Sequence, residues 1–179
     1  AATRRMVEQA DVAAGCLAVG FTLAVPGLGQ VGVVEDLLVD RALHAGRRSA
    51  GLPLASLVDL AHLAPGGETE RLPAHVTADA LAAAALSLAH DAVAADPGAV
   101  ARGLRAYVPG SHRIVTVARG GGVTWVDDSK ATNPHSAQAA LTSLPAGTGV
   151  WILGGDTKGA VFDDLVRAVR PVLRGVVVV

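Results

Sequence analysis

The chain has 179 residues and a net charge of −1, so it carries no electrostatic footprint for nucleic acid. Its mean hydropathy of +0.43 is high, yet no apolar stretch approaches the roughly 18 residues needed to span a bilayer. Residues at the start of the sequence show no secretory pattern, because Arg4 and Arg5 are followed by polar and acidic residues and not by an apolar core. The single cysteine, Cys16, excludes an intramolecular disulfide, fits a reducing cytosol and is expected to be buried in a strand.

The first part of the chain predicts a mixed arrangement of strands and helices. Glu35 and Asp36 are expected to join two of its strands as a tight hairpin, while Asp96 and Pro97 open its last helix. The predicted elements are a helix over 3–10, strands over 16–23, 30–34 and 37–41, a short strand or turn over 52–60, and helices over 76–94 and 98–107.

The second part begins after a break at residues 108–110, where we place a domain boundary. Strands and helices then alternate as in a parallel α/β sheet. The predicted elements are strands over 112–118 and 123–127 around a hairpin turn at 120–122, a helix over 134–144, a strand over 150–153, a helix over 161–169, and a buried strand over 175–179. Because the chain starts in a helix and stops inside this apolar strand, we expect it to be a piece of a longer protein.

The sequence DDSKATN, residues 127–133, is the strongest candidate for a site. It follows a strand, and Asn133 suits the N-cap of the next helix, with Pro134 in the first helical position. The loop should therefore lie at the carboxyl edge of a sheet, where α/β proteins bind small polar or anionic ligands. A solvated polar turn is the plain alternative.

A second polar loop, GGDTKG at residues 154–159, follows the next predicted strand. Successive parallel strands usually lie side by side, so Lys130 and Lys158 should project into one crevice and bind carboxylate or phosphate oxygens. The alternative is two solvated lysines and a double glycine that only forms a turn. No Walker A motif occurs in the chain.

Two further observations concern phosphate and metal binding. Arg113, near the expected domain hinge, has a planar fork that matches phosphate oxygens, although a surface ion pair is an equal alternative. The histidines show no metal-ligand spacing, so no metal is assigned to side chains of this chain.

The motifs SHR (111–113), DDSKATN and GGDTKG, in this order and spacing, resemble the Mur ligases, and among them the members that add D-glutamate. The segment DALAAAAL (79–86) resembles the helix that closes the central ATPase domain of this family, and residues 20–43 loosely resemble its late strands. The resemblance implies an α/β fold in which residues 1–109 are the rear of a P-loop-type central domain. Residues 110–179 would be the front of a Rossmann-like C-terminal domain with a parallel sheet.

The resemblance also implies an ATP-dependent ligase that joins D-glutamate to UDP-N-acetylmuramoyl-L-alanine through an acyl phosphate, with Mg²⁺ ligands and the phosphate loop upstream of this chain. Lys130, Thr132 and Lys158 would hold the D-glutamate carboxylates, with Lys130 also catalytic. Arg113 would meet the ATP phosphates, and Asp128 would bind the ribose. The enzyme would be a cytoplasmic monomer without nucleic-acid or membrane partners, and the isolated fragment would be inactive.

One position departs from the family pattern. The Mur ligases commonly carry His-Asn where this chain has His75 and Val76, and the asparagine contacts adenine. Val76 cannot make that hydrogen bond, so adenine recognition must differ.

The alternatives to a D-glutamate ligase are a non-catalytic α/β binding or scaffolding module and another amino-acid ligase of the same superfamily.

Overall fold

The computed structural model describes residues 15–64, 67 and 69–179. The chain forms two compact units that divide between Ala106 and Tyr107, here called unit 1 and unit 2. The helix predicted over residues 3–10 lies outside the described residues. The assignment of residues 1–109 and 110–179 to two Mur ligase domains stays a prediction.

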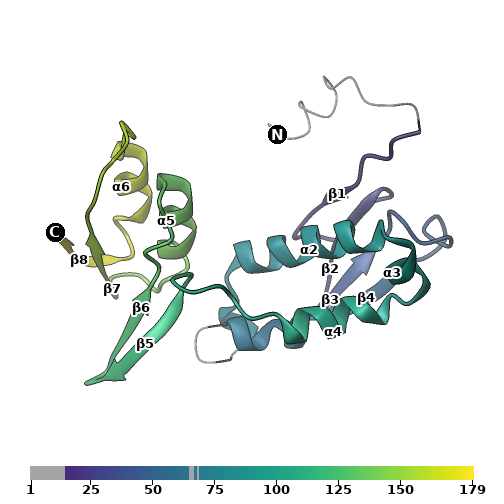
Figure 1. The fold of residues 1–179 in the computed structure, drawn as a ribbon, viewed down its shortest axis with the longest axis horizontal. Coiled ribbons are helices and arrows are strands. Elements are labelled where there is room, and N and C mark those ends of the chain that lie inside the picture. The colour runs from purple at the N-terminus through teal and green to yellow at the C-terminus, as the bar shows by residue number, and fades with distance from the viewer. Residues whose placement is uncertain (1–14, 65–66, 68) are drawn as a thin grey trace. The chain divides into compact units, whose positions relative to one another are not determined.

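Unit 1 contains a four-stranded sheet in which β1 lies parallel to β2 and the other neighbours are antiparallel (Figure 1). Its strands, in spatial order, are β1 (Gly20–Phe21), β2 (Gln30–Val34), β3 (Leu37–Asp40) and β4 (Leu52–Ser56). The predicted hairpin between β2 and β3 is confirmed, and Glu35 takes a left-handed φ of 56° in its turn.

The prediction for the first strand was too long. Backbone bonding to the β2 segment begins at Gly20, whose N–H donates to Gly29, so residues 16–19 form no strand. Cys16 is exposed and lies outside the sheet, so its predicted burial in a strand was wrong.

The helical segments of unit 1 follow the sheet in the chain. They are the 3₁₀ turns η1 (Leu57–Leu63) and η3 (Thr69–Arg71) and the helices α2 (Ala74–Leu88), α3 (Asp91–Ala95) and α4 (Gly98–Ala106). The single helix predicted over 76–94 was wrong. The backbone turns extended at His90, whose Nδ1 accepts a hydrogen bond from the Ala92 N–H and so starts a separate helix.

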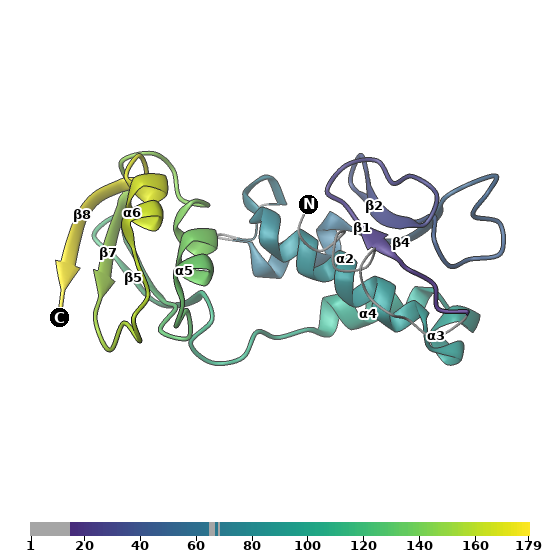
Figure 2. The ribbon, with the colours of Figure 1, turned by 90° about the horizontal axis from the view of Figure 1, so that it is seen from above.

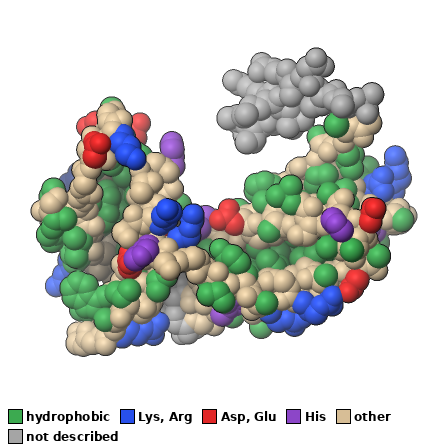
Figure 3. Space-filling view, in the orientation of Figure 1, with side chains coloured by type: hydrophobic (Ala, Val, Ile, Leu, Met, Phe, Trp, Pro, Cys, Tyr) green, Lys and Arg blue, Asp and Glu red, His purple; other side chains and the backbone are tan. Residues whose placement is uncertain are grey.

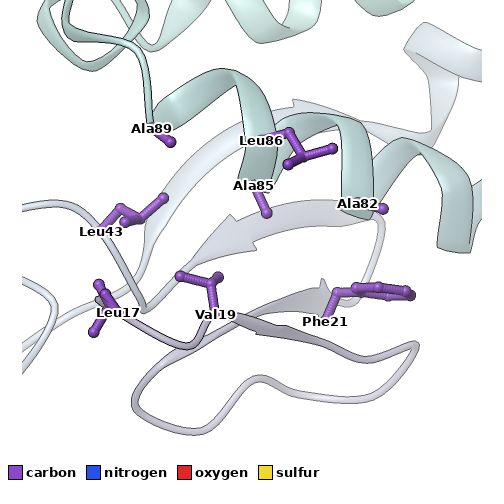
Figure 4. Close-up of a pocket in the computed structure, with 8 residues that line it drawn as sticks. All are labelled: Leu17, Val19, Phe21, Leu43, Ala82, Ala85, Leu86 and Ala89. Atoms are coloured by element: carbon purple, nitrogen blue, oxygen red, sulfur yellow. The ribbon is translucent and has the colours of Figure 1, made fainter. Parts of the chain in front are cut away.

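Helices α2 and α4 pack against the sheet of unit 1 (Figures 1 and 2). Leu38 of β3, Leu60 of η1 and Leu81 of α2 are its largest fully buried apolar side chains. They belong to one continuous hydrophobic cluster of strand and helix residues. An apolar groove remains between the β1 segment and α2 (Figure 4), lined by Leu17, Val19, Phe21, Leu43, Ala82, Ala85, Leu86 and Ala89.

Unit 2 contains two pairs of strands and two helices. The antiparallel pair is β5 (Val115–Gly120) with β6 (Val123–Asp127), and the parallel pair is β7 (Gly149–Leu153) with β8 (Leu173–Val178). Helices α5 (Pro134–Leu141) and α6 (Asp163–Val169) contact each other (Figures 1 and 2). The predicted hairpin turn at 120–122 is confirmed, with positive φ at Gly121 and Gly122.

The continuous parallel sheet predicted for this unit was only partly right. Strands β7 and β8 are parallel, but in the described chain β6 pairs with β5 and not with β7, so the unit is mixed α/β. The predicted burial of the last strand was also wrong. Its valines over 176–179 are 46% to 82% exposed, because nothing in the described chain covers them. Hydrophobic side chains are visible over both strand pairs (Figure 3).

None of the helices in the described chain combines the length and the apolar character that crossing a bilayer requires.

Candidate functional site

The loop after β6 links the end of a strand to the start of a helix, as the sequence predicted. Asn133 caps α5, because its Oδ1 accepts a hydrogen bond of 2.9 Å from the Ser136 N–H. Within the loop the Ala131 N–H donates to the Asp128 carbonyl at 2.9 Å, and the Thr132 N–H donates to the Lys130 carbonyl at 2.9 Å. The side chains of Lys130 and Thr132 are exposed, so a ligand can reach both.

The segment 112–114 lies against this loop, because the β5–β6 register places Val115 opposite Asp127. The backbone N–H of Lys130 donates to the carbonyl of His112 at 3.1 Å. The backbone N–H of Ile114 donates to Oδ1 of Asp128 at 3.2 Å. The structure therefore brings the predicted residues Arg113, Asp128 and Lys130 onto two adjoining segments.

Arg113 lies between two residues with unusual backbone angles. His112 has φ of 64° and Ile114 has φ of 53°, in the left-handed region that a β-branched residue such as isoleucine rarely adopts. Such strain persists only where surrounding contacts enforce it, and it is often found at binding sites. The Arg113 side chain is exposed.

Asp127 joins the two segments through its side chain. Its Oδ2 lies 2.6 Å from Nδ1 of His112, and its Oδ1 accepts a hydrogen bond of 3.0 Å from the Ser129 N–H. The Ser129 N–H first, and then the His112 ring, lower the pKa of Asp127 from 3.8 to about 2. The group is therefore a carboxylate at neutral pH.

The second polar loop, 154–159, is also shaped by a carboxylate. The Lys158 N–H donates to Oδ1 of Asp156 at 2.9 Å, and Lys158 has φ of 50° with its side chain exposed. Gly154 is required for packing, since a Cβ there would collide with the backbone carbonyl of Val179. This close approach accounts for the first glycine of the pair.

The strand pairing that was expected to align the two lysine loops is absent from the described residues, because β6 and β7 belong to different sheets. The convergence of Lys130 and Lys158 therefore stays a prediction. The roles of Thr132, Arg113 and Asp128 toward substrates also stay predictions. His75 and Val76 lie in the first turn of α2, and how adenine is recognised is untested.

Comparison with known proteins tests the resemblance. Residues 112–179 match the family model described as Mur ligase, glutamate ligase domain. The chain is 49% identical over 178 residues, 99% of its length, to UDP-N-acetylmuramoylalanine–D-glutamate ligase of Streptomyces avermitilis. The resemblance to the Mur ligases is confirmed.

Two further relatives with the same name show how far the match extends. The chain is 47% identical over 178 residues to the protein of Streptomyces coelicolor and 46% identical over 187 residues to that of Thermobifida fusca. Each match covers 99% of the chain. The chain spans only 35% to 37% of the length of these relatives.

Sequence reasoning did not assign a role to the side chain of His112 or to that of Asp127. A signal was present, however. A hairpin that turns at residues 120–122 places the residues before β5 next to those after β6. Counting outward from that turn would have set His112 near the DDSKATN loop.

The described side chains include no group of three or more His, Cys, Asp or Glu residues that could hold a metal ion.

Proposed function

We propose that this chain is part of an ATP-dependent ligase that joins D-glutamate to UDP-N-acetylmuramoyl-L-alanine in peptidoglycan synthesis. The observation that carries the proposal is the attachment of the SHR segment to the DDSKATN loop by the hydrogen bond from Lys130 to His112. This attachment sets a guanidinium and an ammonium group on adjoining segments. The names of the relatives supply the substrate class.

The proposed reaction has two steps. The γ-phosphoryl group of ATP passes to the terminal carboxylate of UDP-N-acetylmuramoyl-L-alanine, which gives an acyl phosphate and ADP. The amine of D-glutamate then attacks the acyl carbon, an amide bond forms, the C–O bond to phosphate breaks, and the amine loses a proton. Both steps develop negative charge on oxygen, and cationic side chains stabilise that charge.

D-Glutamate carries two carboxylates, so a site for it needs more than one positive or hydrogen-bonding group. Lys130 and Lys158 supply ammonium groups and Thr132 supplies a hydroxyl, and all three side chains are exposed. Lys130 has a catalytic role in this proposal, because it holds the nucleophile at the acyl phosphate.

ATP would be met by Arg113 and Asp128. The planar guanidinium of Arg113 fits phosphate oxygens, and the carboxylate of Asp128 can accept a hydrogen bond from a ribose hydroxyl. Mg²⁺ would neutralise phosphate charge, with its ligands and the phosphate loop in another part of the longer enzyme. We further propose that residues 1–109 belong to the central ATPase domain, residues 110–179 to the C-terminal domain, and that the enzyme is a cytoplasmic monomer.

The test is a screen of amino acids with the complete ligase, ATP and UDP-N-acetylmuramoyl-L-alanine, in which phosphate release and amide product are both measured. Turnover with D-glutamate is expected. Lys130→Ala should raise the KM for D-glutamate and lower kcat by at least about tenfold, since a charged hydrogen-bonding partner of the substrate is lost.

Two results would contradict the proposal. Turnover with a different amino acid would indicate another ligase of the superfamily. No ATP-dependent turnover with any amino acid would indicate a non-catalytic module. Near-normal kinetics of Lys130→Ala would remove the role assigned to that lysine.

A further inference from the structure

Two side chains that the sequence did not predict as site residues connect the segment 112–114 to the loop 127–133. Asp127 and His112 are fifteen positions apart in the chain, yet Oδ2 and Nδ1 lie 2.6 Å from each other. The Asp127 side chain is 29% exposed and that of His112 is 60% exposed. The pair therefore lies at the surface, beside residues that a substrate could reach, and not in the core.

Each member of the pair holds a different segment. Asp127 uses one oxygen for the His112 ring and the other for the Ser129 N–H, so it fixes the start of its own loop. His112 uses its ring for Asp127 and its backbone carbonyl for the Lys130 N–H. Together these hydrogen bonds connect Asp127 to His112 and His112 to Lys130, and so tie the two segments to each other.

The same hydrogen bonds also restrain the backbone on either side of Arg113. His112 and Ile114 both have positive φ, which costs free energy for residues with a side chain. Two aspartate contacts hold these positions, since Asp127 binds the ring of His112 and Asp128 accepts from the Ile114 N–H. Losing the first contact removes one of the restraints that hold Arg113 in its present direction.

We propose that Asp127 is a positioning residue that acts through His112 to hold Arg113 and Lys130 in one fixed arrangement. Asp127 touches neither substrate in this proposal. It sets the spacing between the group that meets the ATP phosphates and the group that meets D-glutamate. The proposal rests on the function proposed above for those two residues.

The kinetic test uses the complete ligase with Asp127→Ala, His112→Ala and the double variant. Because one arrangement serves both substrates, each single change is expected to raise the KM for ATP and the KM for D-glutamate, each by about fivefold. The double variant should match the worse single variant within about twofold, as for two residues that act as one unit. Asp127→Asn keeps an acceptor for the Ser129 N–H and should recover part of the loss.

A matched control is available in the same unit. Asp164 and Arg167 form a surface pair at 2.7 Å on α6, and Asp164→Ala should leave both KM values unchanged. If the KM increase of the double Asp127 and His112 variant equals the product of the two single increases, the residues act independently and the proposal is overturned. Unchanged kinetics in Asp127→Ala would also overturn it, as would a lower melting temperature with wild-type KM values, which would indicate a structural role alone.

Hydrogen exchange measured by mass spectrometry separates this proposal from the proposed function. In Asp127→Ala, peptides covering residues 112–114 and 128–132 should exchange faster than in the wild type, because the Lys130 and Ile114 amides lose protection. Wild-type exchange in either peptide would overturn the positioning role. A wild-type enzyme without D-glutamate turnover would instead contradict the proposed function, and the exchange result would still decide whether Asp127 orders both segments.

Discussion

Unit 1 and unit 2 differ in what holds their loops in place. Among the described residues, thirteen buried hydrophobic side chains belong to unit 1 and two, Leu165 and Val169, belong to unit 2. Unit 1 is ordered by a core between sheet and helices, whereas the loops of unit 2 are ordered by hydrogen bonds at the surface. Because these hydrogen bonds lie at the surface, charged side chains of the loops remain exposed to solvent and are accessible to substrates.

Two aspartates at strand ends illustrate the difference. Asp40, the last residue of β3, is fully buried, and its carboxylate accepts hydrogen bonds from the N–H groups of Ala42, Leu43 and His44. Asp127, the last residue of β6, likewise accepts a hydrogen bond from a backbone N–H of the loop that follows it, that of Ser129, but stays partly exposed. The same local chemistry stabilises a buried turn in one unit and a candidate substrate loop in the other.

The largest effect is expected from the core of unit 1. Leu81→Ala should lower the free energy of unfolding by about 2–4 kcal/mol, because a fully buried leucine leaves a cavity. Leu86→Ala, at a side chain that is 77% exposed on the same helix, should cost less than about 0.5 kcal/mol. Urea denaturation followed by circular dichroism measures both changes.

Fluorescence sharpens this comparison. Trp125 and Trp151, the only tryptophans, both lie in unit 2, so their emission follows that unit. The fluorescence transition should move less than the circular dichroism transition in Leu81→Ala. Equal costs for Leu81→Ala and Leu86→Ala would contradict the assignment of the core.

A smaller loss of stability is expected in unit 2 when Asp127 is protonated at low pH. The pKa of Asp127 is lowered to about 2 in the folded protein, below its ordinary 3.8. The stabilisation by Ser129 and His112 is therefore complete above about pH 4 and is lost as the pH falls toward 2. A carbon-13 NMR titration of the Asp127 carboxyl measures this midpoint.

The matching variant is His112→Ala. The midpoint of Asp127 should rise in that variant but stay below 3.8, because the Ser129 N–H, the larger cause, remains. A wild-type midpoint at or above 3.8 would contradict the described contacts.

Local patterns in the sequence predicted the local structure well. The hairpin turn at Glu35 and Asp36, the turn at 120–122 and the Asn133 cap all depend on a few neighbouring residues, and all three are confirmed. The helix over 76–94 was wrong because its apolar periodicity continues past a local break at His90. Periodicity does not detect a single extended residue.

Long-range pairing was harder to predict. An alternation of strands and helices favours a parallel sheet, but it does not show that β6 finds its partner in β5. The burial expected of Cys16 and of the last strand was wrong because apolar composition does not show which elements cover a segment. The pair of His112 and Asp127 required the hairpin register, which composition does not reveal.

The central claim is that Lys130 and Lys158 bind one dicarboxylate substrate. The most direct measurement is the KM for D-glutamate of Lys158→Ala in the complete ligase, beside that of Lys130→Ala. We predict an increase of at least about tenfold in Lys158→Ala with the KM for ATP nearly unchanged, as expected when a charged hydrogen bond to one substrate is lost. A KM for D-glutamate within about twofold of the wild type would contradict the claim.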